Sequence, residues 1–347
     1  MKKIVVCPDS FKGSLSAKEV TQTIAKSIKE IHPEIEVIEL PLADGGEGTA
    51  EILTRILYPK IVFTKTHDPL GRVINAKYYL DLSGKKAFIQ SSDIIGLTLL
   101  TIKERNPLIA SSYGLGEIIK KSIKNGVQEI TVSLGGSATC DGGIGMLKAL
   151  GDSYKGVKFN VVCDVNSPLL GEKGAVKVFA PQKGAKPEDI PILEKRLETF
   201  FKETHQKGYC GKEDAWKEGA GCAGGIGFTF LTYLKAHYVN GIDFILQSIN
   251  FNDLIKGADF IITGEGKIDK QSLMGKVLTG VVREASKEKI PVIAIAGIIE
   301  DEELLRAAGI HAIYSIYNPN LSIEENMKTQ IATSNLKKKI KCLLDFQ

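Results

Sequence analysis

A set of short apolar runs, found at both ends of the chain and separated by segments with helical periodicity, constrains the fold most. The runs lie at Ile4–Cys7, Val37–Leu40, Phe260–Thr263, Val292–Ala296 and Ala312–Ile316. Runs of this length are typical of buried strands, and strands that alternate with helices form parallel sheets. We therefore expect a doubly wound, flavodoxin-like α/β domain whose parallel sheet is built from both ends of the chain.

The middle of the chain has a different pattern and a high glycine content. Two stretches that predict a hairpin are followed by two further strands: Val73–Leu82, Lys86–Gln90, Ile130–Leu134 and Val161–Asp164. A chain of 347 residues also has the length of two domains. We expect a second α/β domain, residues 65–256, inserted into the first, so that residues 1–64 and 257–347 form the doubly wound domain.

The first expected strand is followed by the loop Asp9-Ser10-Phe11-Lys12-Gly13-Ser14-Leu15-Ser16. Ser16 and Glu19 have the spacing of a capping box, which marks the start of a helix. Open α/β sheets place ligands at the carboxyl ends of their strands, and a helix start offers free N–H groups to an anion. With the charge of Lys12, the loop predicts a site for a negatively charged small molecule. A solvated loop with an ordinary cap is the alternative.

A second loop, Pro41–Thr49, follows the second expected strand and contains Asp44-Gly45-Gly46-Glu47. Glycines let the backbone approach a ligand closely. Carboxylates at this edge of a sheet can hold a magnesium ion or accept a proton from a hydroxyl. The pattern favours a functional role for Asp44. For Glu47, an acid that complements the helix dipole is an equal alternative.

The third loop, Gly135–Gly145, follows the expected strand Ile130–Leu134 and reads Gly-Gly-Ser-Ala-Thr-Cys-Asp-Gly-Gly-Ile-Gly. Consecutive glycines with Ser and Thr provide backbone N–H groups and hydroxyls that suit a polyphosphate. The loop is neither a Walker P-loop nor a Gly-x-Gly-x-x-Gly motif. A glycine-rich packing turn is the alternative.

Composition excludes several classes of function. The net charge is +4 with acids and bases interspersed, so nucleic acid is not an expected partner. The six cysteines are irregularly spaced, which suits a reducing cytosol and argues against disulfides and a zinc site. We expect a soluble, cytoplasmic protein without a signal peptide or a membrane partner. The oligomeric state, including a homo-oligomer, stays open.

Taken together, these loops resemble the glycerate kinase family, of the type that phosphorylates D-glycerate. The resemblance runs through nearly the whole chain, and many blocks occur in the same order. The matching segments are Pro8–Ser16, Pro41–Thr49, Ser111–Glu117, Gly135–Thr139, Cys163–Val165, Pro168–Leu169, Ala180–Ala185, Gly219–Gly221, Gly224–Gly225 and Thr263–Asp269.

The resemblance implies ATP-dependent phosphorylation of D-glycerate, with magnesium, on a two-domain α/β fold. The better-supported product of the family is 2-phosphoglycerate, although the name is sometimes attached to 3-phosphoglycerate formation. Phosphoryl transfer needs cations around the moving phosphoryl group, backbone donors for the nucleotide and a carboxylate near the attacking hydroxyl. The three loops offer these groups.

Roles follow as hypotheses, beginning with the catalytic residues. Lys12 is expected to neutralise the transferring phosphoryl group or the glycerate carboxylate, and Asp44 to accept the hydroxyl proton or hold magnesium. The other expected site residues are, for the substrate, Asp9, Ser10, Ser111 and Ser112, and for the nucleotide phosphates, Gly135, Gly136, Ser137 and Thr139. Asp164 and Asp269 are candidate metal ligands and Glu265 has the same standing, with helix-capping turn acids as the alternative.

The chain departs from the family pattern at several positions. Cys140 stands where Asn is usual, Gln90 where an acid is common, and Lys267 where Arg is usual. Lysine keeps the charge but loses the bidentate fork of arginine. The segment between Gly151 and Val161 is also shorter than usual, which affects the inserted domain and not the reaction.

Rival hypotheses remain. Under these hypotheses, the chain is instead a kinase for another hydroxy acid, a kinase of the homoserine and mevalonate class, or a non-catalytic sensor of an organic acid. The expected doubly wound sheet speaks against the homoserine and mevalonate class. Intact acids and lysines in the loops speak against the sensor.

Overall fold

The computed structural model describes residues 2–43, 49, 52–53, 57, 59–273 and 276–344, without the side chains of residues 271 and 273. The chain divides into two compact units. The first is Met1–Ile52 with Gly241–Gln347, and the second is Leu53–Asn240. The boundaries expected from the sequence, after residues 64 and 256, lie further along the chain and stay a prediction.

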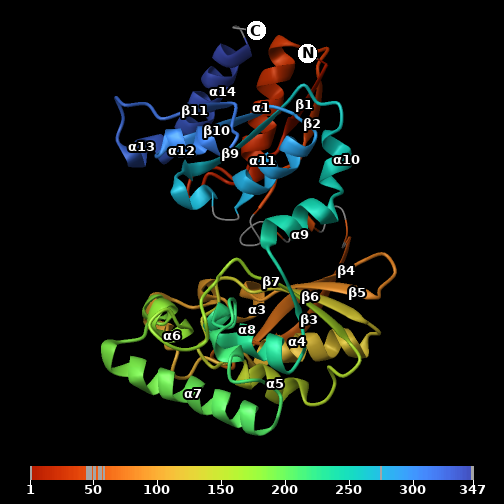
Figure 1. The fold of residues 1–347 in the computed structure, drawn as a ribbon, viewed down its shortest axis with the longest axis vertical. Coiled ribbons are helices and arrows are strands. Elements are labelled where there is room, and N and C mark those ends of the chain that lie inside the picture. The colour runs from red at the N-terminus through yellow and green to blue at the C-terminus, as the bar shows by residue number, and fades with distance from the viewer. Residues whose placement is uncertain are drawn as a thin grey trace. The chain divides into compact units, whose positions relative to one another are not determined.

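The first unit contains a five-stranded parallel sheet in the order β11-β10-β9-β1-β2. Its strands are β1 (Lys3–Val6), β2 (Glu36–Glu39), β9 (Phe260–Ile268), β10 (Val292–Ile299) and β11 (Ala312–Ser315). In Figure 1 this unit therefore carries the colours of both chain ends. The expected doubly wound α/β fold, with a second α/β region inserted into it, is confirmed.

The helices of the first unit cover both faces of this sheet. They are α1 (Ala17–Ile31), α9 (Gly241–Ser248), α10 (Phe251–Ile255), α11 (Val277–Lys287), α12 (Glu302–Ala307), α13 (Ile323–Met327) and α14 (Thr329–Leu344). Side chains alternate across a strand, so Ile4 and Val6 of β1 pack in one core with α1 and α14. Helix α11 contacts β9 and β10.

Local sequence signals start two of these helices. Ser16 and Glu19 form the expected capping box at α1, where the Ser16 Oγ accepts from the Glu19 N–H at 3.2 Å. Ser322 and Glu325 form the same arrangement at α13. Both boxes satisfy N–H groups that a helix start leaves without an intrahelical partner.

The second unit contains a six-stranded mixed sheet in the order β3-β4-β5-β6-β7-β8. Its strands are β3 (Lys60–His67), β4 (Val73–Leu80), β5 (Lys86–Gln90), β6 (Glu129–Ser133), β7 (Lys158–Val162) and β8 (His237–Val239). The predicted hairpin is the antiparallel pair β4 and β5, and β5 to β8 run parallel. The sequence did not predict β3 and β8.

The helices of the second unit form a buried core with this sheet and a second core among themselves. They are α3 (Ser92–Ile95), α4 (Tyr113–Lys124), α5 (Ile144–Leu150), α6 (Ala175–Phe179), α7 (Ile190–Gln206) and α8 (Cys222–Thr232). Short 3-10 turns join them at Leu97–Leu99, Ile102–Glu104, Pro181–Lys183, Pro187–Asp189 and Asp214–Trp216. Among the described residues, no helix has the length and apolar character needed to cross a membrane.

Candidate functional site

A pocket of about 350 Å³ lies in the first unit, at the carboxyl ends of its parallel strands. Of the residues predicted from sequence, Asp9, Ser10, Lys12 and Asp269 line it. The loop after β1 supplies the first three, and the end of β9 supplies Asp269. The structure thus brings together side chains that are about 260 positions apart in the sequence, at the edge where open α/β sheets bind ligands.

Backbone contacts hold the loop after β1 in place. The Asp9 N–H donates to the Gly264 carbonyl at 2.8 Å, and the Phe11 N–H donates to the Leu15 carbonyl at 2.8 Å. Asp9 is buried, and its Oδ1 accepts from the Ser10 N–H at 2.6 Å. The loop therefore has a defined shape.

Gly13 lets this loop turn beneath helix α13. Its φ is +77°, and a Cβ built there would lie 2.8 Å from the Met327 Cε. The Thr329 hydroxyl at the start of α14 donates to the Ser14 carbonyl at 2.9 Å. Residues near the end of the chain thus form one wall of the pocket, and α13 adds Ile323 and Asn326 to the lining.

The pocket combines positive and negative side chains. Lys12, Lys267 and Lys276 line it together with the carboxylates of Asp9, Glu265 and Asp269. The Lys267 Nζ lies 2.9 Å from a Glu300 oxygen and 3.4 Å from an Asp269 oxygen. The hydrogen bond that the Lys267 ammonium donates to Glu300 is the main reason that the pKa of Lys267 is raised. Such a lining suits an anion that also carries hydroxyl groups.

Sequence analysis missed several pocket residues. Lys276, Tyr317 and Asn326 line the pocket but were given no role. The capping box at Ser322 predicted helix α13, yet nothing in the sequence indicates that this helix packs beside Gly13. The second acidic loop, with Asp44 and Glu47, lies outside the described residues.

The glycine-rich loop after β6 lies in the second unit. It pairs with the end of α3, since the Leu97 N–H donates to the Gly136 carbonyl and the Ala138 N–H to the Ile95 carbonyl, each at 2.8 Å. In the part of the chain that the structure describes, the N–H groups of Gly135, Gly136 and Ser137 have no acceptor. Gly136 is exposed, and a Cβ built on Gly135 would meet no atom within 4 Å. These N–H groups are therefore available to an anion.

Polar groups are buried beneath the glycine-rich loop. Ser137 and Thr139 are buried, and so is Lys183, whose Nζ donates to the Ser137 Oγ at 3.0 Å and to the Thr139 carbonyl at 2.7 Å. Burial lowers the pKa of Lys183. The sequence placed Lys183 in a matching segment, but it gave no signal that this side chain supports a loop 44 positions earlier.

Asp141 closes the other end of the loop. Its Oδ2 accepts from the Ser112 N–H and Oγ at 2.8 Å and from the Gly145 N–H at 3.2 Å. Its Oδ1 accepts from the Gly143 N–H at 3.1 Å. Ser112 is fully buried, and its Oγ also accepts from the Met146 N–H at 2.9 Å. These contacts give Ser112 a structural role, so we do not carry it forward as a substrate ligand.

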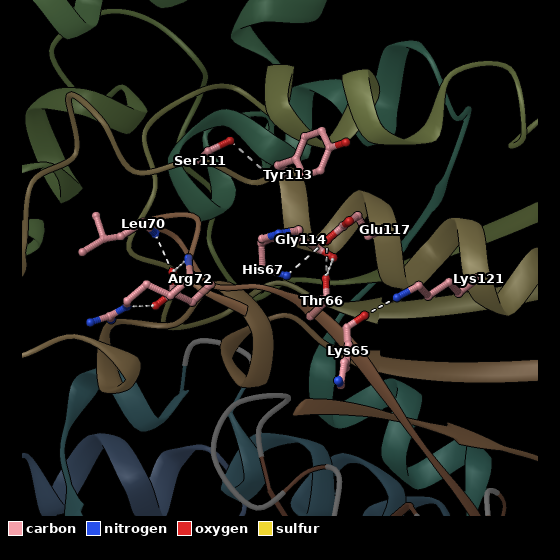
Figure 2. Close-up of polar contacts among 11 residues, drawn as sticks. Lys65, Thr66, His67, Leu70, Arg72, Ser111, Tyr113, Gly114, Glu117 and Lys121 are labelled. Atoms are coloured by element: carbon pink, nitrogen blue, oxygen red, sulfur yellow. Dashed lines mark hydrogen bonds and ion pairs between the residues drawn. The ribbon is translucent and has the colours of Figure 1, made fainter. Parts of the chain in front are cut away.

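Figure 2 shows how the end of β3 holds the start of α4. The Glu117 Oε2 lies 2.8 Å from both the Thr66 Oγ1 and the His67 Nδ1, and it accepts from the His67 N–H at 3.1 Å. Partial burial raises the pKa of Glu117, but the hydrogen bonds from His67 and Thr66 outweigh it, so the pKa lies below its ordinary value. Ser111, half-buried, accepts from the Tyr113 N–H at 3.2 Å.

The two candidate metal ligands lie in different units. Asp164 follows β7 and is exposed, whereas Asp269 is half-buried and lines the pocket. Within the described residues, no group of three or more His, Cys, Asp and Glu side chains is placed to hold an ion. Magnesium in phosphotransferases is commonly held by one or two carboxylates together with substrate phosphates. The carboxylates of Asp9 and Asp269 fit that requirement.

Comparison with known proteins identifies the family to which a chain with this fold and these loops belongs. The model of the glycerate kinase family matches residues 4–154 and 152–346. The chain is 39% identical to a glycerate kinase of Haemophilus influenzae, over 90% of this chain and 91% of that protein. It is 37% identical to a glycerate kinase of Bacillus subtilis, over 93% and 92% of the two chains. It is 35% identical to a glycerate 2-kinase of Escherichia coli K12, again over 93% and 92%.

A solved structure is similar over the whole fold. The crystal structure of a candidate glycerate kinase 2 from Salmonella typhimurium LT2 superposes with a TM-score of 0.81 at 33% identity, covering 99% of this chain and 97% of that one. Sequence and fold thus agree over nearly the full length. The chain therefore belongs to the glycerate kinase family, a family of phosphotransferases.

Proposed function

We propose that this chain catalyses the ATP-dependent phosphorylation of D-glycerate to 2-phosphoglycerate. The observation that carries the proposal is the pocket of the first unit, where the loop after β1 and the end of β9 place Asp9, Ser10, Lys12 and Asp269 around one space of about 350 Å³. A small hydroxy acid offers a carboxylate to the lysines and hydroxyl groups to the carboxylates and Ser10.

The glycine-rich loop of the second unit supports nucleotide binding. The N–H groups of Gly135, Gly136 and Ser137 can donate to phosphate oxygens, as backbone nests do in other phosphate sites. Thr139 is buried within this loop, and we assign it a role in the loop's shape and polarity. Ser111 is half-buried at the start of α4 and stays a proposed substrate ligand.

The chemistry assigned to the first unit is charge stabilisation and proton removal. Lys12 neutralises either the glycerate carboxylate or the transferring phosphoryl group, since most of the catalysis of phosphoryl transfer is positioning and electrostatic stabilisation. Asp44 accepts the proton of the attacking hydroxyl or takes part in holding magnesium. Asp269 in the pocket of the first unit and Asp164 after β7 stay candidate magnesium ligands, and the metal would neutralise phosphate charge when bound with ATP.

The experiment is an ATP-consumption assay with D-glycerate, followed by phosphorus NMR of the product. A resonance of 2-phosphoglycerate supports the proposal, and one of 3-phosphoglycerate moves the reaction to the other hydroxyl. ATP consumption only with a different hydroxy acid reassigns the substrate. Binding of glycerate without ATP consumption makes the protein a sensor. Light scattering on the same preparation decides the oligomeric state, which the sequence leaves open. A cytoplasmic location is part of the proposal.

A further inference from the structure

Lys183 is a buried lysine with no carboxylate partner in the part of the chain that the structure describes. Its side chain lies at the end of the 3-10 turn Pro181–Lys183 and is 3% exposed. Its Nζ donates to two neutral oxygens, the Ser137 Oγ and the Thr139 carbonyl. Among the described residues, no carboxylate oxygen lies within 4.0 Å of the Lys183 Nζ, so this ammonium forms no ion pair with them.

The surroundings of Lys183 compensate its charge only in part, because Asp141 is the anionic group that faces it and makes its own hydrogen bonds elsewhere. Burial is the main cause that lowers its pKa, and the ionisable groups that face it are Cys140, Cys222 and Asp141. Burial raises the pKa of the Cys140 thiol, and a hydrogen bond with Cys163 together with burial raises that of Cys222, so both thiols are neutral near pH 7. The Asp141 carboxylate already accepts hydrogen bonds from Ser112, Gly143 and Gly145.

A buried ammonium without an ion-pair partner destabilises a folded protein, unless a counter-charge arrives or the group gives up its proton. The position is nonetheless held tightly. Gly184 follows with φ +93°, and a Cβ there would lie 2.3 Å from the Arg105 carbonyl oxygen. The fold therefore places this lysine with little freedom directly beneath the glycine-rich loop.

The glycine-rich loop adds backbone donors to the positive charge of Lys183. Within the described residues, the N–H groups of Gly135 and Gly136 have no acceptor and Gly136 is exposed, while the Lys183 ammonium donates to the neighbouring Ser137. The Thr139 Oγ1 is buried and has no hydrogen-bond partner among the described residues. Positive electrostatic potential thus comes from both the backbone and the lysine, and an anion on the loop would complete the arrangement.

Resting on the proposed function, we propose that Lys183 is the buried cation of the nucleotide-binding loop, and that its counter-charge is the polyphosphate of the nucleotide bound on Gly135–Ser137. Lys183 acts through the loop that it supports, so it is a positioning residue. Its effect grows with the number of phosphate groups on the ligand and is absent for a ligand without phosphate.

Proton uptake is a consequence of this arrangement. Burial lowers the pKa of Lys183 in the free protein, and a bound anion favours the charged form and raises the pKa again. At a pH above the pKa that Lys183 has in the free protein, ADP therefore binds together with a proton. The affinity of the protein for ADP then falls as the pH rises. A lysine that only donates hydrogen bonds to the loop shows neither effect.

The test is isothermal titration calorimetry with ADP, AMP and adenosine, run at alkaline pH in two buffers of different ionisation enthalpy. Lys183→Gln keeps hydrogen-bond donors and removes the charge, whereas Lys183→Met removes both. Lys186→Gln removes an exposed charge three positions away and is the matched control. We expect Lys183→Gln to weaken ADP binding about ten- to hundredfold, AMP less and adenosine not at all, and to abolish proton uptake.

Three results overturn the inference. In the first, Lys183→Gln binds ADP as the wild type does while Lys183→Met does not, which leaves only a hydrogen-bonding role. In the second, Lys183→Gln loses adenosine and ADP affinity equally, which indicates a distorted site. In the third, the wild type takes up no proton. In each of these cases, the proposed function still stands if the wild type consumes ATP with glycerate. If the wild type binds no ADP, the proposed function and the inference about Lys183 are both wrong.

Discussion

The two units of this chain offer positive charge to anions in different ways. The pocket of the first unit uses lysine side chains near the surface, with Lys12 and Lys267 exposed and carboxylates beside them. The loop of the second unit uses backbone N–H groups above the buried Lys183. Side chains that move can follow a group whose charge changes during reaction, whereas a rigid loop suits a group that stays in place. The difference fits the proposal that the first unit binds the hydroxy acid and the second unit the nucleotide phosphates.

The largest expected effect comes from Lys12. Lys12→Ala removes the cation assigned to the transferring group, so we expect kcat to fall about a thousandfold with D-glycerate and ATP. Steady-state kinetics measure the loss, and circular dichroism reports whether the fold is kept. Lys18→Ala on the exposed side of α1 is the control. Activity near that of the wild type in Lys12→Ala would remove this lysine from the mechanism.

Asp44→Asn tests the acid of the first unit. It removes the group assigned to proton acceptance or magnesium binding, and general bases commonly contribute about a hundredfold or more to rate. We expect a loss of kcat of that order at saturating magnesium. Recovery of the rate at high magnesium assigns Asp44 to the metal, and a loss that magnesium does not change assigns it to the proton. If Asp44→Asn keeps the full kcat at both ordinary and high magnesium concentrations, Asp44 neither accepts the proton nor holds the metal.

Two glycines separate a structural requirement from a ligand requirement. Gly13 has a positive φ and lies against Met327, so Gly13→Ala should lower the free energy of unfolding by about 1–2 kcal/mol. Gly135 has open space around its Cα, so Gly135→Ala should change stability by less than about 0.5 kcal/mol. The methyl group should instead weaken ADP binding severalfold. Urea unfolding and calorimetry measure the two effects, and equal destabilisation by both substitutions would contradict the distinction.

The smallest effect concerns the contact of Glu117 with β3 (Figure 2). The folded-state pKa of Glu117 lies below the ordinary value of 4.5, so the ionised side chain stabilises the fold above that value. This stabilisation is lost as the pH falls through the folded-state pKa. We expect Glu117→Gln to lower the free energy of unfolding by about 1 kcal/mol at pH 7, with the difference shrinking below pH 4.5.

Denaturant unfolding at several pH values measures the difference for Glu117→Gln. Thr66→Val removes one of the donors to Glu117 and should cause a smaller part of the same loss. A difference between wild type and Glu117→Gln that stays constant down to acid pH would show that the carboxylate charge does not contribute.

Strand prediction succeeded where burial makes a strand uniformly apolar. The inner strands β1, β9 and β10 lie where the sequence places them because they are largely buried, and the partly exposed edge strands β2 and β11 were found from their short apolar runs. Strand β3 was missed since most of its side chains are at least partly exposed at the edge of the second sheet, and β8 has only three residues. Neither strand has an apolar pattern strong enough to distinguish it from a loop.

By itself, the sequence determined the alternation of strands and helices, the capping boxes and the loops in which Asp9, Lys12 and Gly135 lie, because these depend on residues only a few positions apart. Only the tertiary structure decided that α13 forms a wall of the pocket, that Ser112 donates hydrogen bonds to Asp141, and that Lys183 lies beneath the glycine-rich loop. Those contacts join residues far apart in the chain. The burial of Lys183 and its lack of a carboxylate ion pair among the described residues are properties of packing, which local sequence patterns do not encode.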